Sequence, residues 1–417
     1  MKKIIFLIYM MSNGGLERHT VNLSNELVEK GYSVDIVAVR GVSKTQFFDI
    51  KDNVRLISVS EKRKRIDIID ASSLSKSVAE ESGDKISLQN SGQQGKQSLK
   101  RKLTSSVLDF WHNSALLHRF SGRYKKIYRN YFIAENPDII VAWGIDRYER
   151  AYKAAKGLNC KLINAEIVAH EDAIPESSNL YSYHCGMLKK ASAIIVQTHS
   201  EKEYFKKIND NVLVINNPLK PGLPLPYKGE RSKTIVNFCR MAPQKNISLL
   251  LDAFKLLHND FPDYRLKIYG NTVEPAEIEY KKKMIKKIYS TGLEDCVSIL
   301  PPAADIHEKV LKSAMFASSS DFEGLSNSML ESMAIGLPCV CTDCLGGGTR
   351  EVMTDHENGL IVPMNNAEAM YRAMKEFVEN PELAQKCSEN AVKIREKLSA
   401  KGIARQWLEV IESLERE

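Results

Sequence analysis

Two glutamates lie in one short stretch whose residue types could bind a ligand rich in hydroxyl groups. Glu323 and Glu331 are separated by seven residues, among them Gly324 and Ser326. A carboxylate can accept two hydrogen bonds from neighbouring hydroxyls, and the amides at a helix N-terminus favour an anion such as phosphate. The alternative is that both glutamates only complement a helix dipole, a contribution of about 0.3–1 kcal/mol each.

A predicted strand, turn and helix position these two carboxylates. The apolar run 314–317 predicts the strand, Gly324 permits a tight turn, and Ser326 and Asn327 are good N-cap residues. Apolar residues at helical spacing then continue to Gly336. The pattern places the first carboxylate in the turn and the second in the helix, at the carboxyl end of a strand, where α/β sheets bind ligands.

Two cations lie in an earlier turn of the same kind. Arg240 and Lys245 separate the predicted strand 234–238 from the predicted helix 247–259. Two fixed cations beside a helix N-terminus would hold a diphosphate and stabilise it as a leaving group. The alternative is a pair of solvated surface cations.

A glycine turn follows the first predicted strand of the chain. Gly14 and Gly15 separate the apolar run 4–10 from a helical pattern at 16–29, and a second strand pattern follows at 33–39. Glycines in such a βαβ start let backbone amides approach a ligand closely. The pair matches neither a dinucleotide nor a nucleoside-triphosphate fingerprint, and on its own it is weak evidence for a ligand-binding loop.

Strands alternate with helices along most of the chain. Further strand patterns occur at 54–59, 138–143, 160–165, 193–196, 265–269, 297–300, 337–341 and 359–362, and helical patterns at 276–291 and 306–313. A proline-rich connector at 220–226 divides the series. The pattern predicts an α/β protein with two doubly wound, Rossmann-like parallel-sheet domains.

Composition indicates a globular protein and excludes an ordinary transmembrane helix. The 417 residues are 43% hydrophobic and 27% charged, and no apolar run reaches 18 residues. A net charge of +7 fits anionic small molecules, a membrane surface or nucleic acid equally well. No small-residue cleavage site follows the apolar start, so a buried strand is favoured over a signal peptide. Eight scattered cysteines predict reduced thiols and a cytoplasmic setting.

Three cysteines are close enough in the chain to suggest a metal site. Cys339, Cys341 and Cys344 could supply three thiolates, with His356 as a distant fourth ligand. Because the first two fall on a predicted buried strand, structural cysteines are favoured.

Residues 61–107 interrupt the alternating pattern. They are rich in Ser, Gln, Gly, Lys and Asn, which predicts a loosely ordered insertion. Aromatic residues interleaved with Lys and Arg follow up to Phe132. This segment fits a helix at a membrane interface, and it fits equally well a helix that packs on the sheet with a solvated basic face.

The Glu323–Glu331 stretch resembles the signature of the retaining GT-B glycosyltransferases of family 4. The Arg240 and Lys245 turn resembles the donor-phosphate site of that family, and Gly14 and Gly15 followed by Glu17 resemble its amino-terminal glycine turn. The resemblance is strongest over 234–363 and thin over 61–136. One departure is Cys239, because the family usually has glycine before the arginine.

The resemblance implies a role for each matched residue. Arg240 and Lys245 would bind the diphosphate of a nucleotide sugar, Glu331 the ribose, and Glu323 the hydroxyls of the transferred sugar. Backbone amides around Gly324, Leu325 and Ser326 would contact the sugar or phosphate. Gly270 would lie beside the nucleobase, where the family often has a second glycine that this chain lacks. Gly14 and Gly15 would form an acceptor or phosphate loop.

The first domain must also place a residue near the anomeric carbon. His170 is the candidate, because it lies just past the predicted strand 160–165, and Glu166 is its rival. A lone histidine near a strand end is more often structural. Gly346–Gly348 form a further glycine turn, which could line the cleft or be structural only.

The resemblance implies two domains that face a central cleft. We expect an acceptor-binding domain at 1–219, a linker at 220–233, a donor-binding domain at 234–400, and a terminal helix at 401–417 that crosses back to the first domain. No Asp-x-Asp triplet occurs, so the two cations would replace a metal and no divalent ion or cofactor is expected.

The expected activity is transfer of a hexose from a UDP-sugar to a hydroxyl of a growing, lipid-linked glycan in capsule or other surface-polysaccharide synthesis. Such an acceptor would place the protein at the inner face of the cell membrane. The alternatives are a sugar-nucleotide epimerase of the same fold and a non-enzymatic nucleic-acid-binding protein that uses the basic runs 62–65 and 100–102.

Overall fold

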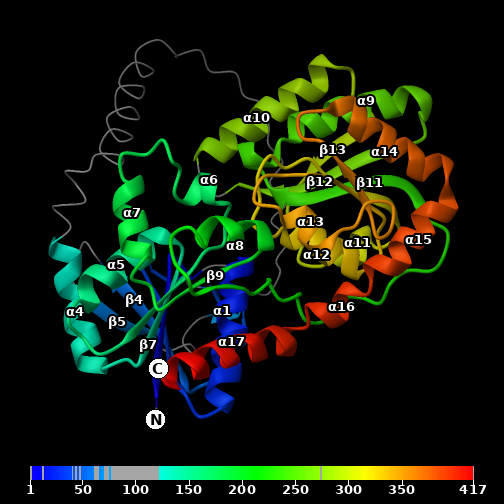
Figure 1. The fold of residues 1–417 in the computed structure, drawn as a ribbon. Coiled ribbons are helices and arrows are strands. Elements are labelled where there is room, and N and C mark those ends of the chain that lie inside the picture. The colour runs from blue at the N-terminus through cyan, green and yellow to red at the C-terminus, as the bar shows by residue number, and fades with distance from the viewer. Residues whose placement is uncertain are drawn as a thin grey trace. The chain divides into compact units, whose positions relative to one another are not determined.

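The computed structural model describes residues 2–11, 14–39, 41–42, 45–46, 48–60, 65–69, 75–76, 122–272 and 275–416 (Figure 1). The chain divides into two compact units. Residues 1–163 and 174–191 form the first unit, and residues 164–173 and 192–417 form the second. Most of the predicted insertion, the aromatic residues before 122 and the basic runs 62–64 and 100–102 lie outside the described residues.

The first sheet has eight strands in the order β10-β9-β8-β7-β1-β2-β4-β5. Its strands are β1 (Lys3–Ile8), β2 (Ser33–Ala38), β4 (Val54–Ser60), β5 (Arg65–Ile69), β7 (Ile139–Trp143), β8 (Lys161–Ala165), β9 (Ala193–Val196) and β10 (Val212–Val214). The chain moves outward from β1 through β2 and β4 on one side, and through β7 and later strands on the other. The sheet is therefore doubly wound about β1, with β5 as an antiparallel edge strand.

Helices connect the parallel strands of this part of the chain. They are α1 (Gly15–Glu29), α4 (Gly122–Glu135), α5 (Ile145–Ala155), α6 (His170–Ala173), α7 (Tyr181–Leu188) and α8 (His199–Phe205). A small two-stranded sheet pairs β3 (Thr45–Gln46) with β6 (Ser75–Lys76). The predicted strand at 4–10 ends at Ile8, and Gly14 forms the N-cap of α1 as the glycine turn predicts.

The second sheet has six parallel strands in the order β13-β12-β11-β14-β15-β16. They are β11 (Ser232–Arg240), β12 (Arg265–Asn271), β13 (Val297–Leu300), β14 (Ser313–Ser318), β15 (Cys339–Thr342) and β16 (Leu360–Val362). The prediction of two doubly wound parallel sheets is confirmed. Buried apolar side chains of β11, β12 and β14 form one core with the helices Ile247–Asp260 (α9) and Ala367–Glu379 (α14).

The helices of the second unit that follow β11 are α9 (Ile247–Asp260), α10 (Pro275–Ser290), α11 (Ile306–Val310), α12 (Asn327–Ala334), α13 (Gly348–Val352), α14 (Ala367–Glu379), α15 (Pro381–Ala391), α16 (Ile394–Lys397) and α17 (Ala400–Arg416). A 3-10 turn, η2 (Pro243–Lys245), precedes α9. The helix predicted at 306–313 ends at Val310, because Ser313 already begins β14 and pairs with β11. Within the described ranges, no helix has both the length and the apolarity needed to cross a bilayer.

Helix α4 carries the described part of the aromatic-basic segment. Tyr128, Tyr131 and Phe132 are at most 8% exposed, whereas Ile133 is 55% exposed. For α4, the interpretation as a helix that packs on the protein is therefore correct, because its aromatic face is buried and is not available to a membrane.

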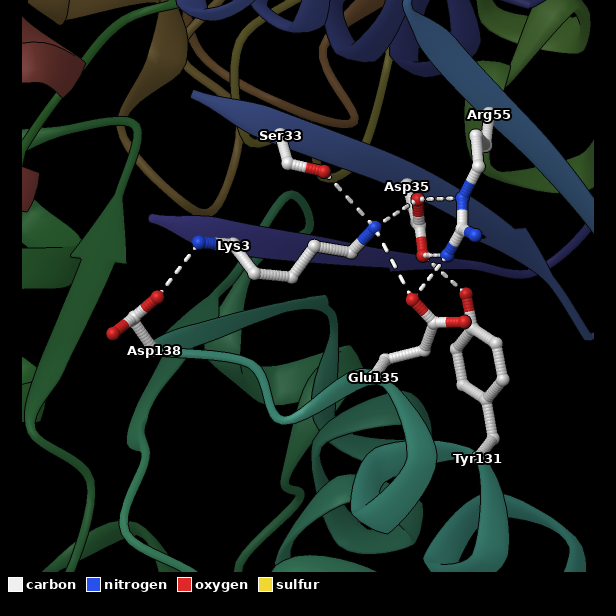
Figure 2. Close-up of polar contacts among 7 residues, drawn as sticks. All are labelled: Lys3, Ser33, Asp35, Arg55, Tyr131, Glu135 and Asp138. Carbon is white, nitrogen blue, oxygen red and sulfur yellow. Dashed lines mark hydrogen bonds and ion pairs between the residues drawn. The ribbon is translucent and has the colours of Figure 1, made fainter. Parts of the chain in front are cut away.

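Tyr131 of α4 also joins a buried ionic cluster at the amino end of β1 and β2 (Figure 2). Asp35 is fully buried and accepts hydrogen bonds from Lys3 Nζ at 2.6 Å and from Arg55 Nε and Nη2 at 2.8 and 2.6 Å. Arg55 also pairs with Glu135. Each buried charge is thus matched by an opposite charge on a neighbouring strand or helix.

Burial disfavours the ionised form of Asp35, but the hydrogen bonds from Arg55, Lys3 and Tyr131 outweigh it, so the pKa of Asp35 lies below its ordinary value. A lowered pKa stabilises the folded state above the unfolded pKa of about 3.9, and this stabilisation is lost as the pH falls through the folded value. The cluster therefore contributes to stability at neutral pH and weakens in acid.

We expect Asp35→Asn to lower the free energy of unfolding by about 3 kcal/mol at pH 7, because Lys3 and Arg55 lose their buried counter-charge. In urea titrations, the variant should also lose less stability than the wild type between pH 6 and pH 3. Asp52→Asn, at an exposed position of the same unit, is the control and should change neither quantity. Equal effects of the two substitutions would contradict this role of the cluster.

Candidate active site

The second sheet brings its predicted site residues together through its strand order. β11 pairs with β14 on one side and with β12 on the other, so the chain direction across the sheet reverses between β11 and β14. Ligands of open α/β sheets bind at the carboxyl ends of the strands beside such a reversal. Arg240 ends β11, and Glu323 follows β14, so both lie at this edge.

Lys245 and Glu323 form an ion pair at this edge. Their side chains are only 14% and 12% exposed, and Ser320 Oγ donates a second hydrogen bond to Glu323 Oε1 at 2.9 Å. A cation and a carboxylate are therefore held in contact, partly shielded from water, by two different turns. The predicted association of the lysine turn with the Glu323 turn is present in the structure.

Hydrogen bonds from side chains to the backbone hold these two turns against each other. Ser319 Oγ lies 2.9 Å from the carbonyl oxygens of both Lys245 and Asn246. Asn246 has φ +41°, caps α9 through its side chain, and donates from Nδ2 to Asp321 Oδ1 at 2.8 Å. Asparagine tolerates this left-handed conformation better than most residues, which gives Asn246 two structural roles.

Glu331 lies in α12, as predicted, and is buried. His307 of α11 lies with Nε2 2.8 Å from Glu331 Oε2, and the histidine is itself 3% exposed. Phe238 contacts the imidazole edge-on, with ring centroids 5.9 Å apart. His307 was missed in the sequence, because no motif marks it; it lies only in a short helical pattern.

Arg240 also has a carboxylate partner that the sequence did not reveal. Its Nε lies 3.3 Å from Glu277 Oε1 in the first turn of α10. The glutamate side chain is 6% exposed, whereas that of Arg240 is 50% exposed. The buried carboxylate anchors one side of the guanidinium and leaves the rest accessible to an anionic ligand.

The turn around Gly324 packs with unusually close backbone contacts. A Cβ at Gly348 would lie 1.9 Å from Gly324 O, and one at Gly346 would lie 2.2 Å from Glu323 O and 2.9 Å from Ala169 Cβ. Gly346 and Gly347 also have φ of +88° and +73°. These glycines are therefore required by the backbone, and they bring residues next to His170 close to the Glu323 turn.

His170 begins α6 and is held by Glu201 of α8. The Nδ1 atom of His170 lies 2.9 Å from Glu201 Oε1, and the backbone N–H of His170 donates to Glu201 Oε2 at 3.0 Å. The imidazole ring stacks on the ring of Tyr204, with the two ring centroids 3.6 Å apart. When Nδ1 carries the proton, Nε2 becomes the acceptor. Glu166, its rival, is 4% exposed and accepts a hydrogen bond from the N–H of Ile167.

Thr198 connects α8 to the glycine turn. Its hydroxyl donates to Gly346 O at 2.7 Å and accepts from the N–H of Glu201 at 3.1 Å. The Thr198 to Glu201 spacing is that of a capping box, but the Glu201 carboxylate binds His170. This spacing was the signal in the sequence that could have drawn attention to Glu201.

The other predicted donor residues have different surroundings. Leu325 is buried and its carbonyl accepts from Asn217 Nδ2 at 3.3 Å. Ser326 is the N-cap of α12, as predicted, but its hydroxyl accepts no hydrogen bond from a backbone N–H in the first turn of that helix. Gly270 pairs with Cys239 across β12 and β11, and a Cβ there would lie 2.6 Å from Met241 Cγ. Gly14 and Gly15 belong to the other unit.

The cysteines of the second unit are protonated thiols. Burial raises the pKa of Cys239 to about 12, and burial also raises the pKa of Cys341 and Cys344. Cys339 Sγ donates to Leu337 O at 3.2 Å. In the part of the chain that the structure describes, no group of three or more His, Cys, Asp or Glu side chains is arranged around a potential metal position.

Residues 227–394, which hold Arg240, Lys245, Glu323 and Glu331, match the family model described as glycosyl transferases group 1. An uncharacterised glycosyltransferase of Haemophilus influenzae is 29% identical over 220 residues, 51% of this chain and 59% of that protein.

A Campylobacter jejuni enzyme, named N-acetylgalactosamine-N,N'-diacetylbacillosaminyl-diphospho-undecaprenol 4-alpha-N-acetylgalactosaminyltransferase, is 32% identical over 167 residues, 40% of this chain and 43% of the enzyme. The matches with these two relatives span less than two thirds of the length of each.

Solved structures resemble the chain over almost its whole length. Staphylococcus aureus TarM superposes with a TM-score of 0.72 at 17% identity, covering 98% of both chains. Sucrose-phosphate synthase from Thermosynechococcus elongatus has a TM-score of 0.74 at 14% identity, covering 99% of both. Anabaena HepE in complex with UDP and glucose has a TM-score of 0.71 at 16% identity, covering 99% of this chain and 100% of that one. The fold is that of the GT-B glycosyltransferases.

We expect Gly348→Ala to destabilise the protein by about 1–3 kcal/mol or more, because its methyl group would overlap Gly324 O. The measurement is urea unfolding. Gly186→Ala is the matched control: this glycine lies in α7, and its Cβ position has nothing within 4 Å. The free energy of unfolding of the Gly186→Ala variant should equal that of the wild type or exceed it by about 0.5–1 kcal/mol. Equal stability of the Gly348 variant and the wild type would show that the two turns separate easily.

Proposed function

We propose that this protein is a retaining, metal-independent glycosyltransferase that transfers a hexose from a UDP-sugar to a hydroxyl of a growing glycan. The observation that carries the proposal is the shielded contact of Lys245 with Glu323 at the reversal of the second sheet. The residues that match the glycosyl transferases group 1 model include Lys245 and Glu323, and the GT-B fold of the chain also supports the proposal. An arrangement of one cation and one carboxylate suits a ligand that has both phosphate and hydroxyl groups.

In this proposal, Lys245 and Arg240 bind the donor diphosphate and stabilise the negative charge that grows as it leaves. The half-exposed guanidinium of Arg240 and the adjacent start of α9 support this assignment. Glu323 accepts hydrogen bonds from hydroxyls of the transferred sugar. Glu331, held by His307, accepts hydrogen bonds from the ribose.

The reaction breaks the bond between the anomeric carbon and the diphosphate oxygen, and it forms a bond from that carbon to the acceptor oxygen. In the proposed retaining route, the acceptor attacks from the face that the diphosphate leaves, and a diphosphate oxygen takes the acceptor proton. His170 is proposed to lie beside the sugar, with Nε2 as acceptor because Glu201 faces Nδ1. Its contact with Glu201 fixes the orientation of the ring.

We further propose that the acceptor belongs to surface-polysaccharide synthesis and is linked to a lipid carrier. The relative from Campylobacter jejuni is named for a diphospho-undecaprenol substrate, and a Bacillus subtilis relative is named as a poly(glycerol-phosphate) alpha-glucosyltransferase. UDP is the proposed nucleotide, and the HepE and GtfA structures of the same fold were solved with UDP.

We expect Glu331→Gln to weaken UDP binding about tenfold to a hundredfold, because a charge-assisted hydrogen bond contributes about 1.5–3 kcal/mol. Glu323→Gln should lower kcat at least about tenfold without weakening UDP binding, because the substitution removes a sugar contact and also the carboxylate that competes for Lys245. His307→Ala should raise the Kd of UDP, and His307→Gln should restore part of it, because the amide can still donate to Glu331. Calorimetry with UDP and assays of UDP release measure these effects. The assigned roles would be refuted if Glu323→Gln weakened UDP binding while Glu331→Gln lowered kcat and left UDP binding unchanged.

We expect transfer to proceed unchanged in the presence of a chelator, because Lys245 and Arg240 provide the positive charge at the diphosphate. The assay measures UDP release with EDTA and then with added Mn²⁺ or Mg²⁺. Activity that EDTA abolishes and Mn²⁺ restores would refute metal independence without refuting sugar transfer. Isomerisation of the UDP-sugar in the absence of acceptor would instead indicate an epimerase.

A further inference from the structure

Helix α10 has a stripe of exposed apolar side chains. Ile278, Ile285 and Tyr289 are 44%, 38% and 66% exposed. They are seven and four residues apart, so at 3.6 residues per turn they lie on one face of the helix. Single exposed apolar residues are common on protein surfaces, but three in register on one helix form a continuous surface.

The helix already has a separate face that packs on the protein. Glu277, Met284 and Ile288 are at most 5% exposed, and the latter two belong to the core of the second sheet. α10 lies beside α9 in this layer (Figure 1). The exposed stripe therefore lies beside the buried face and does not take part in the packing that holds the helix in place.

Lysines flank the apolar stripe. At about 100° per residue, Lys281 lies on one side of it and Lys282 and Lys286 on the other. The helix contains five lysines and two glutamates. Lys282 pairs with Glu279 at 2.9 Å, and Lys287 pairs with Asp252 at 2.6 Å. Among the described residues, no carboxylate pairs with Lys281, Lys283 or Lys286, and the latter two are exposed. The surface thus combines apolar side chains with a net positive charge.

We propose that this face of α10 docks on an anionic lipid bilayer. Ile278, Ile285 and Tyr289 enter the boundary between headgroups and acyl chains, and the neighbouring lysines contact the lipid phosphates. The long lysine stems reach headgroups while the apolar stripe is buried. A nucleic acid would be complementary to the lysines alone and would leave the three apolar side chains in water, so the bilayer is the better match.

The position of α10 connects this surface to the candidate active site. The helix follows β12, and Glu277 in its first turn holds Arg240. Docking through α10 brings the carboxyl edge of the second sheet close to the lipid surface. The link between docking and catalysis rests on the proposed function, because a lipid-linked acceptor would be presented at that surface. The binding of α10 to lipid does not depend on the proposed function.

The test is co-sedimentation of the full chain with vesicles, without any sugar substrate. We expect binding to vesicles of phosphatidylcholine mixed with phosphatidylglycerol, little binding to phosphatidylcholine alone, and loss of binding at high salt. The triple variant Lys281→Glu, Lys282→Glu and Lys286→Glu should bind at least about a hundredfold more weakly, from the expected contribution of each lysine near a charged surface. The variant Ile285→Ser with Tyr289→Ser should also bind more weakly at unchanged charge.

A matched control reverses the same number of charges elsewhere, at the exposed Lys228, Lys255 and Lys401. It should bind vesicles nearly as well as the wild type. Calorimetry with UDP on every variant separates this inference from the proposed function, because the docking variants should bind UDP normally. Equal sedimentation of the α10 and control variants would overturn the assignment, and so would binding to neutral vesicles that equals binding to anionic ones. Concentration-dependent dimerisation that Ile285→Ser with Tyr289→Ser abolishes would assign the stripe to a second copy instead, and would also overturn it.

Discussion

The parallel pairing of β11 with β14 is the constraint on which the candidate active site depends. Residues that are far apart in the chain, such as Lys245 and Glu323, meet only because these two strands are adjacent and end at the same edge. The pairing is supported from within the sheet, where Asn237 Nδ2 of β11 donates to Ala317 O of β14 at 2.7 Å. Above the strands, Ser319 fixes the two connecting turns to each other. The site is consequently a property of the sheet edge and of backbone contacts, and it needs few specialised side chains.

Much of this arrangement could be predicted from the sequence, because it follows from local patterns. The apolar runs that became β9 and β13 have the predicted bounds, and Glu323 and Glu331 lie in the predicted turn and helix. The antiparallel edge strand β5 was not predicted, because it has no distinctive apolar run. The short strand β10 was not predicted either, although the apolar run 212–215 was a signal for it. The apolar pattern of a segment predicts well which of its residues are buried. An edge strand instead forms by pairing with a neighbouring strand, and the sequence of the edge strand itself does not contain that information.

The partners of the site residues could not be predicted for a related reason. His307, Glu277 and Glu201 contact Glu331, Arg240 and His170 across separations of tens of residues, and each lies in an ordinary helical pattern. Their importance comes from tertiary contacts that bury a charge beside another charge. The same holds for the ionic cluster around Asp35, whose members come from three strands and α4 and look like ordinary alternating or surface positions in the sequence.

The contact between Lys245 and Glu323 has a consequence for selectivity. In this arrangement Lys245 and Glu323 neutralise each other, so this pair presents little net charge to an anion. A simple phosphate that engaged Lys245 would leave a poorly hydrated carboxylate without its cation, and this desolvated charge would oppose binding. A ligand that brings hydroxyls for the carboxylate together with phosphate for the lysine satisfies both groups at once. The ion pair therefore favours a molecule that replaces both of its halves over an anion that replaces only the carboxylate.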